Sequence, residues 1–481
     1  MKKSKKNIKT IKKTCNKLIV LSIVSLINLV VFSVLILKIN ILSLKYSILI
    51  IFLLLIINLL GLLLLSRKSK IISKLGIIIL SISIILVGVG SYYLYYIDNF
   101  LDKSFNSERK YITTYYILTS SSNKYSSKKD IKGNVYYYAN SSNNKSILKK
   151  IREDFNIKVS PYDNIISMLK DTVNKKIDFM LIDENSYNII LNLDKDIEQG
   201  NLKIVYKFKV EDMTKNNKKE KPAYNIYIRG IDTDGLSDYN AIVTVNTITH
   251  EVLLTSIPRD YYMEIYGTNG KKDSLSHMFI YPEGTSRKSL EKFFGISLDY
   301  SVDITPEGVV DLVNQLGGIT YCSDQSFNAY IPDLNTKTIA KAGWIRINKG
   351  CQVLDGSKTY AVAHERNSFV GRDRMRQKNC QKIIIAIFER LKSTNSFVNY
   401  KGILESLNNL YTTDIPRRVI TSIAKDTIDG AEWKFITQSV DGSDKWDADI
   451  AILNDKGYAM IPNESDVINA TNKINETLKK K

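Results

Sequence analysis

The stretch YNIYIRGIDTDGLSDYNAIVTVNTITHEVLLTSIPRDYY, residues 224–262, decides the fold of the larger part of the chain. Tyr224–Ile231, Ala241–Asn246 and Val252–Ile257 are rich in the β-branched and aromatic residues that favour strands. Asp, Gly and Ser lie between the first two, as in a turn between strands, and Pro258 follows the third. We therefore expect three strands whose ends carry ionisable side chains.

Helix signals follow these strands. Thr305 is a good N-cap residue before a proline, and Gly317-Gly318 ends the helix that it starts. Tyr300–Ile304 and Ile319–Cys322 flank this helix as strands, and a second helix is expected from about Asp373 to Leu391. The pattern predicts an α/β/α sandwich around a mixed sheet.

The chain beyond its first hundred residues is too long for one ordinary domain. Residues 107–210 alternate strand-like and helix-like segments, which indicates a small α/β accessory domain without an evident catalytic constellation. Residues 211–222 are polar, end in proline and suggest a linker. We place the main domain at 223–395 and a C-terminal extension, packed on it, at 396–481.

The N-terminal hundred residues are a membrane anchor. Leu18–Leu37, Tyr46–Ser66 and Leu75–Ile97 are apolar runs of about 20 residues or more, the length at which an α-helix crosses a bilayer core. A cleavable signal peptide is the alternative for the first run. That run is too long, lacks a small-residue cleavage site and is followed by two further spans.

Positive charges predict the orientation of these spans. Residues 1–17 form a basic tail with eight lysines, and the loop after the second run holds four basic residues, whereas the loop after the first run holds two. Because basic loops stay inside, we expect a cytoplasmic N-terminus and an extracellular region after Ile97.

The basic composition mostly reflects this topology. The formal net charge is +19, and the first hundred residues supply 14 basic and one acidic residue. Only about six net positive charges remain for the other 381 residues. The composition therefore favours a membrane protein with modest anion affinity over a nucleic-acid binder.

The chain has four cysteines, too few for a fold built on disulfides. Cys15 is expected inside the cell, and Cys380 in the core of a helix. Cys322 and Cys351 would meet an environment in which disulfides persist, so a bridge and two buried thiols both stay open. No Cys/His spacing suggests zinc.

Two carboxylates follow the first predicted strand. Asp232 ends the run YNIYIRGI, and Asp238 precedes the next strand. One or two carboxylates are the usual protein share of a Mg²⁺ site. The alternative, favoured by spacing alone, is a pair of turn residues near Gly235.

A second candidate follows the third strand. Pro258 stops the hydrogen-bond ladder and leaves Arg259 at the rim of the sheet, where Asp260 could orient it. The planar guanidinium of arginine binds phosphate oxygens in pairs. A surface ion pair is the equal alternative.

A third, basic cluster begins at His364-Glu365-Arg366 and continues as Gly371-Arg372-Asp373-Arg374-Met375-Arg376-Gln377-Lys378. Four arginines and a lysine fall within 13 residues, which favours an anion at a helix N-terminus over a solvated helix end. The helix face expected to carry the site and continue into the core comprises Arg374, Gln377, Lys378, Gln381, Ile384, Ile385 and Phe388.

Taken together, these motifs resemble the LytR–CpsA–Psr family of cell-wall glycopolymer transferases. The similarity covers about Tyr224–Leu391 and is weaker to the C-terminus. Its motifs are GIDT (230–233), SD (237–238), TSIPRDYY (255–262), LVNQLGGI (312–319), LDGSKTYAVAHER (354–366) and GRDRMRQKNCQ (371–381). The three spans and the accessory domain resemble the CpsA-like branch.

The resemblance implies a Mg²⁺-dependent transfer of a glycopolymer from a polyprenyl-pyrophosphate donor to peptidoglycan, with the lipid tail in an apolar pocket. Asp232 and Asp238 would hold Mg²⁺. Groups at the reacting phosphates would be Arg259, Asp260, Arg366, Asp373 as a conceivable base, and Arg374. Further substrate contacts would come from Lys272, His364, Arg372, Arg376, Gln377 and Lys378.

The sequence departs from the family pattern at four positions. Leu236 stands where members have Arg, Ser274 where they have Lys, His364 where they have Arg and Lys378 where they often have Gln. Lys272 is close enough to substitute for the missing lysine. Charge-assisted contacts contribute roughly 1.5–3 kcal/mol each, so these changes could weaken the site.

Three functions therefore compete. An active transferase is the first, and a weakened protein that holds a lipid-linked precursor for a partner is the second. A DNA-binding regulator is the third, and the expected topology opposes it.

Overall fold

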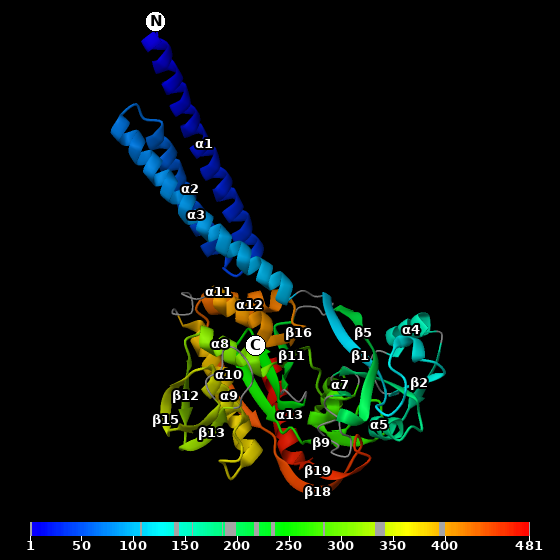
Figure 1. Ribbon diagram of the computed structural model, residues 1–481. Helices are drawn as coiled ribbons and strands as arrows, with labels where there is room; N and C mark the ends of the chain where they lie inside the picture. The colour runs from blue at the N-terminus through cyan, green and yellow to red at the C-terminus, as the bar shows by residue number, and fades with distance from the viewer. Residues whose placement is uncertain are drawn as a thin grey trace. The chain divides into compact units, whose positions relative to one another are not determined.

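The computed structural model describes residues 2–480 except 106–107, 139–143, 156, 185, 188–198, 216–220, 232–235, 282–283, 332–341 and 394–399. The chain forms two compact units, and Figure 1 labels many of their elements. The first comprises Met1–Asn106 and Pro416–Glu432, and the second comprises Ser107–Ile415 and Trp433–Lys481.

The first unit is helical and confirms the three predicted spans. Its helices are α1 (Lys2–Ile39), α2 (Leu44–Leu65), α3 (Lys70–Ser104) and α12 (Arg417–Ile428). The apolar parts of α1, α2 and α3 have mean hydropathies of 2.8, 3.3 and 2.5, and most of their large apolar side chains are exposed. Such surfaces suit lipid rather than water.

Small and polar residues bring the three spans together. A Cβ at Gly76 of α3 would meet the backbone of Leu65 in α2 at 2.5 Å, so only glycine allows this approach. The buried amide of Asn58 donates to the Ser83 hydroxyl at 3.1 Å. The Asn28 amide donates to a carbonyl of α3 at 2.8 Å.

An ion network joins α12 to the ends of α1 and α3. Asp98, which is buried, accepts from Lys38 at 2.6 Å and from Arg417 at 2.6 Å. Arg417 also pairs with Asp102. The network attaches a short helix from the C-terminal region to the C-terminal ends of α1 and α3.

The second unit begins with the accessory region. Its sheet has the order β3-β2-β4-β1-β5. The strands are β1 (Glu108–Ser120), β2 (Asn134–Tyr138), β3 (Lys158–Tyr162), β4 (Phe179–Asp183) and β5 (Leu202–Lys215). Helices α4 (Asn144–Phe155) and α5 (Ile165–Val173) pack on it. The expected small α/β fold is present.

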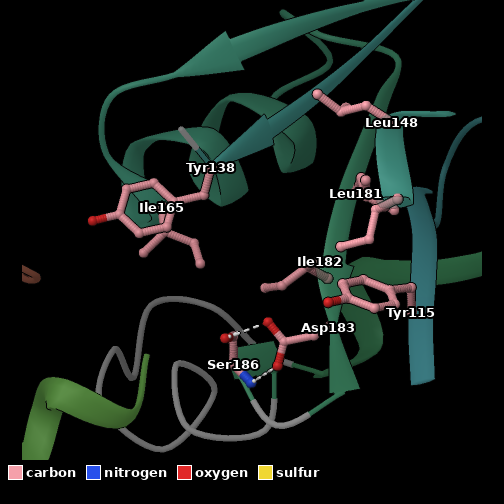
Figure 2. Close-up of a pocket in the computed structure, with 9 residues that line it drawn as sticks. Tyr115, Tyr138, Leu148, Ile165, Leu181, Ile182, Asp183 and Ser186 are labelled. Atoms are coloured by element: carbon pink, nitrogen blue, oxygen red, sulfur yellow. Dashed lines mark hydrogen bonds between the residues drawn. The ribbon is translucent and has the colours of Figure 1, made fainter. Parts of the chain in front are cut away.

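A cavity in this region, shown in Figure 2, is too small for a ligand. Its volume is about 10 Å³, room for about one water molecule. Asp183 fills its polar corner by accepting from the backbone and hydroxyl of Ser186 at 2.9 and 2.6 Å. The cavity gives the accessory region no candidate site.

The main sheet has six strands in the order β16-β11-β6-β7-β8-β17. They are β6 (Ala223–Ile231), β7 (Ser237–Asn246), β8 (Glu251–Ile257), β11 (Tyr300–Ile304), β16 (Tyr411–Thr413) and β17 (Lys434–Ser439). β6–β11 and β8–β17 are parallel pairs, and the other three pairs are antiparallel. The predicted mixed sheet is confirmed.

Side chains of the sheet alternate between two layers of helices. Tyr227 and Ile242 lie in the core that the first layer shares, together with Leu290 and Ile474. That layer consists of α7 (Thr285–Phe294) and α13 (Glu464–Lys479).

The second layer covers the opposite face. It consists of α8 (Pro306–Gln315), α9 (Gly356–His364) and α10 (Arg372–Lys392), with α11 (Tyr400–Leu410) against α8. The Thr305 hydroxyl accepts from the Gly308 N–H at 3.3 Å, which confirms the predicted N-cap.

Short two-stranded sheets extend the main domain. They pair β9 (Tyr262–Glu264) with β10 (Lys272–Ser274), β12 (Ile319–Ser323) with β15 (Gly350–Leu354), β13 (Phe327–Ile331) with β14 (Gly343–Ile347), and β18 (Gly442–Ile450) with β19 (Asp455–Pro462). Cys322 faces Cys351 in register and is joined to it by a disulfide. Of the two alternatives, a disulfide and two buried thiols, the structure therefore has the disulfide.

Three expectations about the domain boundaries need correction. Residues 211–215, expected in a linker, extend β5 because they pair with β1. The C-terminal region, expected as an extension packed on the main domain, instead supplies both edge strands of its sheet, β16 and β17. The accessory region and the main domain also share one hydrophobic core within the second unit.

Candidate functional site

An apolar cavity of about 210 Å³ lies between the main sheet and its second helix layer. Ile304, Val309, Leu312, Ile383, Ile384 and Ile387 line its apolar part. Its polar wall is formed by Asp238, His364 and Arg376. A cavity with an apolar interior and a charged wall suits an amphiphilic ligand.

Asp238 is the centre of the charged wall. It lies at the start of β7, where the side chain keeps only 15% of its exposure. One carboxylate oxygen pairs with Arg259, and the other accepts from Arg376 at 2.7 Å. Burial by itself would raise the pKa of Asp238, but the charges of Arg376 and Arg259 outweigh it and hold the pKa below its ordinary value.

Arg376 is the most deeply buried cation of the cluster, with 4% of its side chain exposed. It lies in the second turn of α10 and bridges Asp238 to Asp373. Its Nε is buried and finds no hydrogen-bond partner among the described residues. A buried unused donor at the wall of a cavity is suited to a ligand oxygen.

Asp373 is engaged on both oxygens. It pairs with Arg376 and accepts from the Gln377 amide at 2.8 Å. Both partners lie in α10 itself, so these contacts orient Asp373 and Arg376 within the helix. Each oxygen keeps a second lone pair, so a carboxylate held in this way can still accept a proton.

Arg259 lies in the loop that follows β8. Besides Asp238 it contacts Asp260, with 3.4 Å between Nε and the carboxylate. Burial raises the pKa of Asp260, although Arg259 opposes that effect. The stronger partner of Arg259 is therefore Asp238.

Arg374 points to a different partner. Its Nε donates to Asp441 at 2.6 Å, and its Nη2 donates to the Gly442 carbonyl at 2.8 Å. The hydrogen bond with Asp441 raises the pKa of Arg374. Because 41% of the side chain is exposed, a ligand could still reach it.

The other expected residues are more scattered. Exposed side chains are Lys272, Arg366, Arg372 and Lys378. Lys272 lies 5.8 Å from the Tyr262 ring. His364 lines the cavity with its ring stacked 3.9 Å from that of Tyr360. Asp232 lies outside the described residues.

The predicted face of α10 is wrong in detail. The residues of α10 that line the cavity are Arg376, Cys380, Ile383, Ile384 and Ile387, whereas Lys378 is exposed. Hydrophobic spacing placed Arg374 in the stripe because it could not foresee a buried arginine, which its two carboxylate partners make tolerable.

Several site residues were missed by sequence reasoning. Cys380 and Tyr239 line the cavity, and burial raises the pKa of the Cys380 thiol to about 12. Asp441, the partner of Arg374, lies 67 residues further along the chain. Its only sequence signal is its place at the end of a strand-like run, Trp433–Asp441.

A magnesium site fits the described residues only in part. Asp238 is the type of carboxylate that Mg²⁺ takes, but both of its oxygens accept from arginines. Within the described ranges, no group of three or more His, Cys, Asp or Glu is arranged to hold a metal.

A model of the LytR_cpsA_psr family matches residues 187–466. Polyisoprenyl-teichoic acid–peptidoglycan teichoic acid transferase TagU of Enterococcus faecalis is 28% identical over 218 residues, 44% of this chain and 67% of that protein. The corresponding TagT of Bacillus subtilis is 27% identical over 198 residues, 39% of this chain and 58% of that protein.

Among solved structures, that of Bacillus subtilis TagV has a TM-score of 0.45 at 22% identity and covers 55% of this chain and 100% of that one. Across eight curated relatives, the match spans 53% to 68% of their own length.

Proposed function

Because this chain belongs to the LytR–CpsA–Psr family, we propose that it transfers a glycopolymer from a polyprenyl-pyrophosphate carrier to peptidoglycan. The names of the relatives TagU and TagT, teichoic acid–peptidoglycan transferases, support this activity. We propose polyprenyl pyrophosphate as the carrier and a teichoic-acid-like polymer or a capsular polysaccharide as the glycopolymer.

The observation that carries the proposal is the junction of the apolar cavity with Asp238 and Arg376. A polyprenyl chain needs an apolar cavity, and a pyrophosphate needs cations close to its end. Arg259, Arg374 and Arg376 supply guanidinium groups around this junction. The donor would exchange some of their carboxylate contacts for phosphate contacts.

The reaction is a phosphoryl transfer. An acceptor hydroxyl oxygen bonds to the glycan-linked phosphorus, the bond from that phosphorus to the bridging oxygen breaks, and polyprenyl phosphate leaves. The hydroxyl proton passes to a carboxylate or to water. Such transfers depend on positioning and charge neutralisation, which we assign to Arg259, Arg366, Arg374 and Arg376.

Asp260 and Asp373 are the candidate carboxylates for accepting the proton of the acceptor hydroxyl. The raised pKa of Asp260 means that it holds a proton more readily than an exposed aspartate. We propose Mg²⁺ as the cofactor, held by Asp238 and by Asp232, where it would add positive charge at the pyrophosphate.

We also propose an orientation for the chain. The basic tail would lie in the cytoplasm, and residues beyond Ile97 would lie outside, where peptidoglycan is assembled. Membrane lipid, the donor and peptidoglycan are then its partners.

A weakened precursor-binding protein is the second candidate. At two positions where the family has cations, Leu236 lies in the hydrophobic core and Ser274 is fully buried. The fold has therefore packed around these uncharged residues. Such a protein would keep the donor bound without consuming it.

One experiment separates the two. The full-length protein in detergent is mixed with a short polyprenyl-pyrophosphate glycan and uncrosslinked peptidoglycan, and the products are identified by mass spectrometry. Glycan-modified peptidoglycan and free polyprenyl phosphate support the transferase. Bound but unconsumed donor supports the binder, and neither binding nor product rejects both.

A further inference from the structure

The β18–β19 hairpin carries an aromatic pair whose tryptophan is exposed. Trp446 is 73% exposed, and its ring lies 4.7 Å from that of Tyr458, at 46°. Tryptophan is largely buried in most folds, and the chain has only three. An exposed tryptophan set against a second ring is suited to binding.

The backbone holds this pair in place. The β18–β19 ladder shifts register between Lys445 and Ala448, so Trp446 lies in a β-bulge. Bulges re-aim side chains and are frequent beside active sites. The Tyr458 hydroxyl donates to Asp444 at 3.0 Å, which fixes the second ring and leaves a carboxylate beside it.

Both strands of the hairpin are attached to the candidate site. The Met460 N–H donates to the Asp260 carbonyl at 2.7 Å, and Arg374 binds the Gly442 carbonyl at 2.8 Å. Tyr458 is two residues from Met460, roughly 7 Å along the strand. The charge of Asp444 reaches Arg374 and contributes to its raised pKa.

The hairpin lies on the other side of Arg374 from the apolar cavity. Arg376 lines that cavity, and Arg374 instead contacts Asp441 and Gly442. Residues two apart on a helix point in roughly opposite directions, about 200° apart. A ligand that extends from the cavity past the arginines would meet the hairpin on its far side.

The charge of the hairpin selects the kind of ligand. Residues 442–462 contain four aspartates and two lysines. An acidic surface repels a glycopolymer rich in phosphate, and it suits a glycan whose hydroxyl, amide or amine groups donate hydrogen bonds. One face of a pyranose ring consists of C–H groups, which stack on an aromatic ring.

We propose that Trp446, Tyr458 and Asp444 form a subsite for a sugar ring of the acceptor glycan. This inference rests on the proposed transfer to peptidoglycan and names the site at which that acceptor is held. Trp446 and Tyr458 supply the stacking surface, and Asp444 accepts a hydrogen bond from the sugar. The acceptor hydroxyl is thereby brought towards the arginine cluster.

Trp446→Ala in the full-length protein tests the subsite. The probe is a set of soluble peptidoglycan fragments released by a muramidase, and binding is followed by saturation-transfer NMR. The Kd for the fragments should rise about tenfold or more, while Trp446→Phe should restore most of the affinity. Binding of the polyprenyl-pyrophosphate donor should not change.

Trp344→Ala is the matched control. Trp344 is 70% exposed and also contacts a tyrosine, Tyr330, but it lies on the β13–β14 hairpin. Its loss should leave fragment binding unchanged. An equal effect of both substitutions, an unchanged Kd in Trp446→Ala, or a weaker donor affinity instead would overturn the subsite.

The binding readout keeps the two proposals apart. Binding that depends on Trp446 without any glycan transfer would support the subsite and reject the transferase. Transfer with the same acceptor KM in the wild type and in Trp446→Ala would support the transferase and reject the subsite.

Discussion

Arg376 donates to Asp238 across 2.7 Å and thereby joins the second turn of α10 to the start of β7. Both side chains are largely buried, so each charge depends on the other. Together with His364, the pair forms the polar wall of the apolar cavity. The unmet Nε of Arg376 leaves one buried donor available to a ligand.

Asp238→Asn should destabilise the protein. It leaves Arg259 and Arg376 without their shared carboxylate, and breaking a buried pair costs about 3–5 kcal/mol. The Tm of the second unit, followed by tryptophan fluorescence, should fall by several degrees. The matched control is Asp324→Asn, which removes an exposed partner of Lys382 and should cost about 1 kcal/mol or less. Equal shifts would contradict the account.

The carboxylate of Asp238 should make the stability of the folded protein depend on pH in the acidic range. Its pKa in the folded protein is held below the ordinary value of 3.8. The stabilisation is therefore present above that value and is lost as the pH falls through the lowered pKa. The Tm difference between wild type and Asp238→Asn should shrink below about pH 4. A Tm difference that stays constant with pH would contradict a lowered pKa of Asp238 in the folded protein.

Arg376→Lys should impair donor use more than its charge alone would suggest. Lysine keeps one positive charge but loses the fork that contacts Asp238, Asp373 and the ligand. The kcat/KM for the donor should fall about 10- to 100-fold, as charge-assisted contacts of roughly 1.5–3 kcal/mol imply. Arg346→Lys, on an exposed residue of the β13–β14 hairpin, is the control and should stay near wild type. Similar losses in both variants would mean that burial of Arg376 has no special role.

Chelation tests the proposed metal. Transfer should fall at least about tenfold in EDTA and return with Mg²⁺, because a divalent ion neutralises the pyrophosphate. Full activity in EDTA would remove Mg²⁺ from the mechanism and leave charge neutralisation to the arginines.

Local patterns in the sequence predicted the parts of the structure that local physics controls. Three uncharged runs became three helices, and Thr305 caps α8 as expected. The strands in residues 224–257 also follow their composition.

Pairing between strands that are far apart in the chain could not be predicted from the sequence. The edge strands β16 and β17 are short, and what makes them strands is their pairing with β11 and β8. Likewise, the sequence predicted that Asp260 orients Arg259, whereas the fold brings in Asp238 from β7. Contacts between residues far apart in the chain leave no periodic signal.

The cavity offers the most direct test of the central claim, that this protein binds a polyprenyl-pyrophosphate lipid. Ile384 lines the cavity, whereas its neighbour Ile385 faces a separate surface pocket. Lipid extracted with full-length protein should be measured by mass spectrometry for wild type, Ile384→Trp and Ile385→Trp. We predict polyprenyl phosphate or pyrophosphate with the wild type and Ile385→Trp, and its loss in Ile384→Trp because the indole fills the cavity. Absence of polyprenyl lipid from the wild type, or its undiminished presence in Ile384→Trp, would contradict the account.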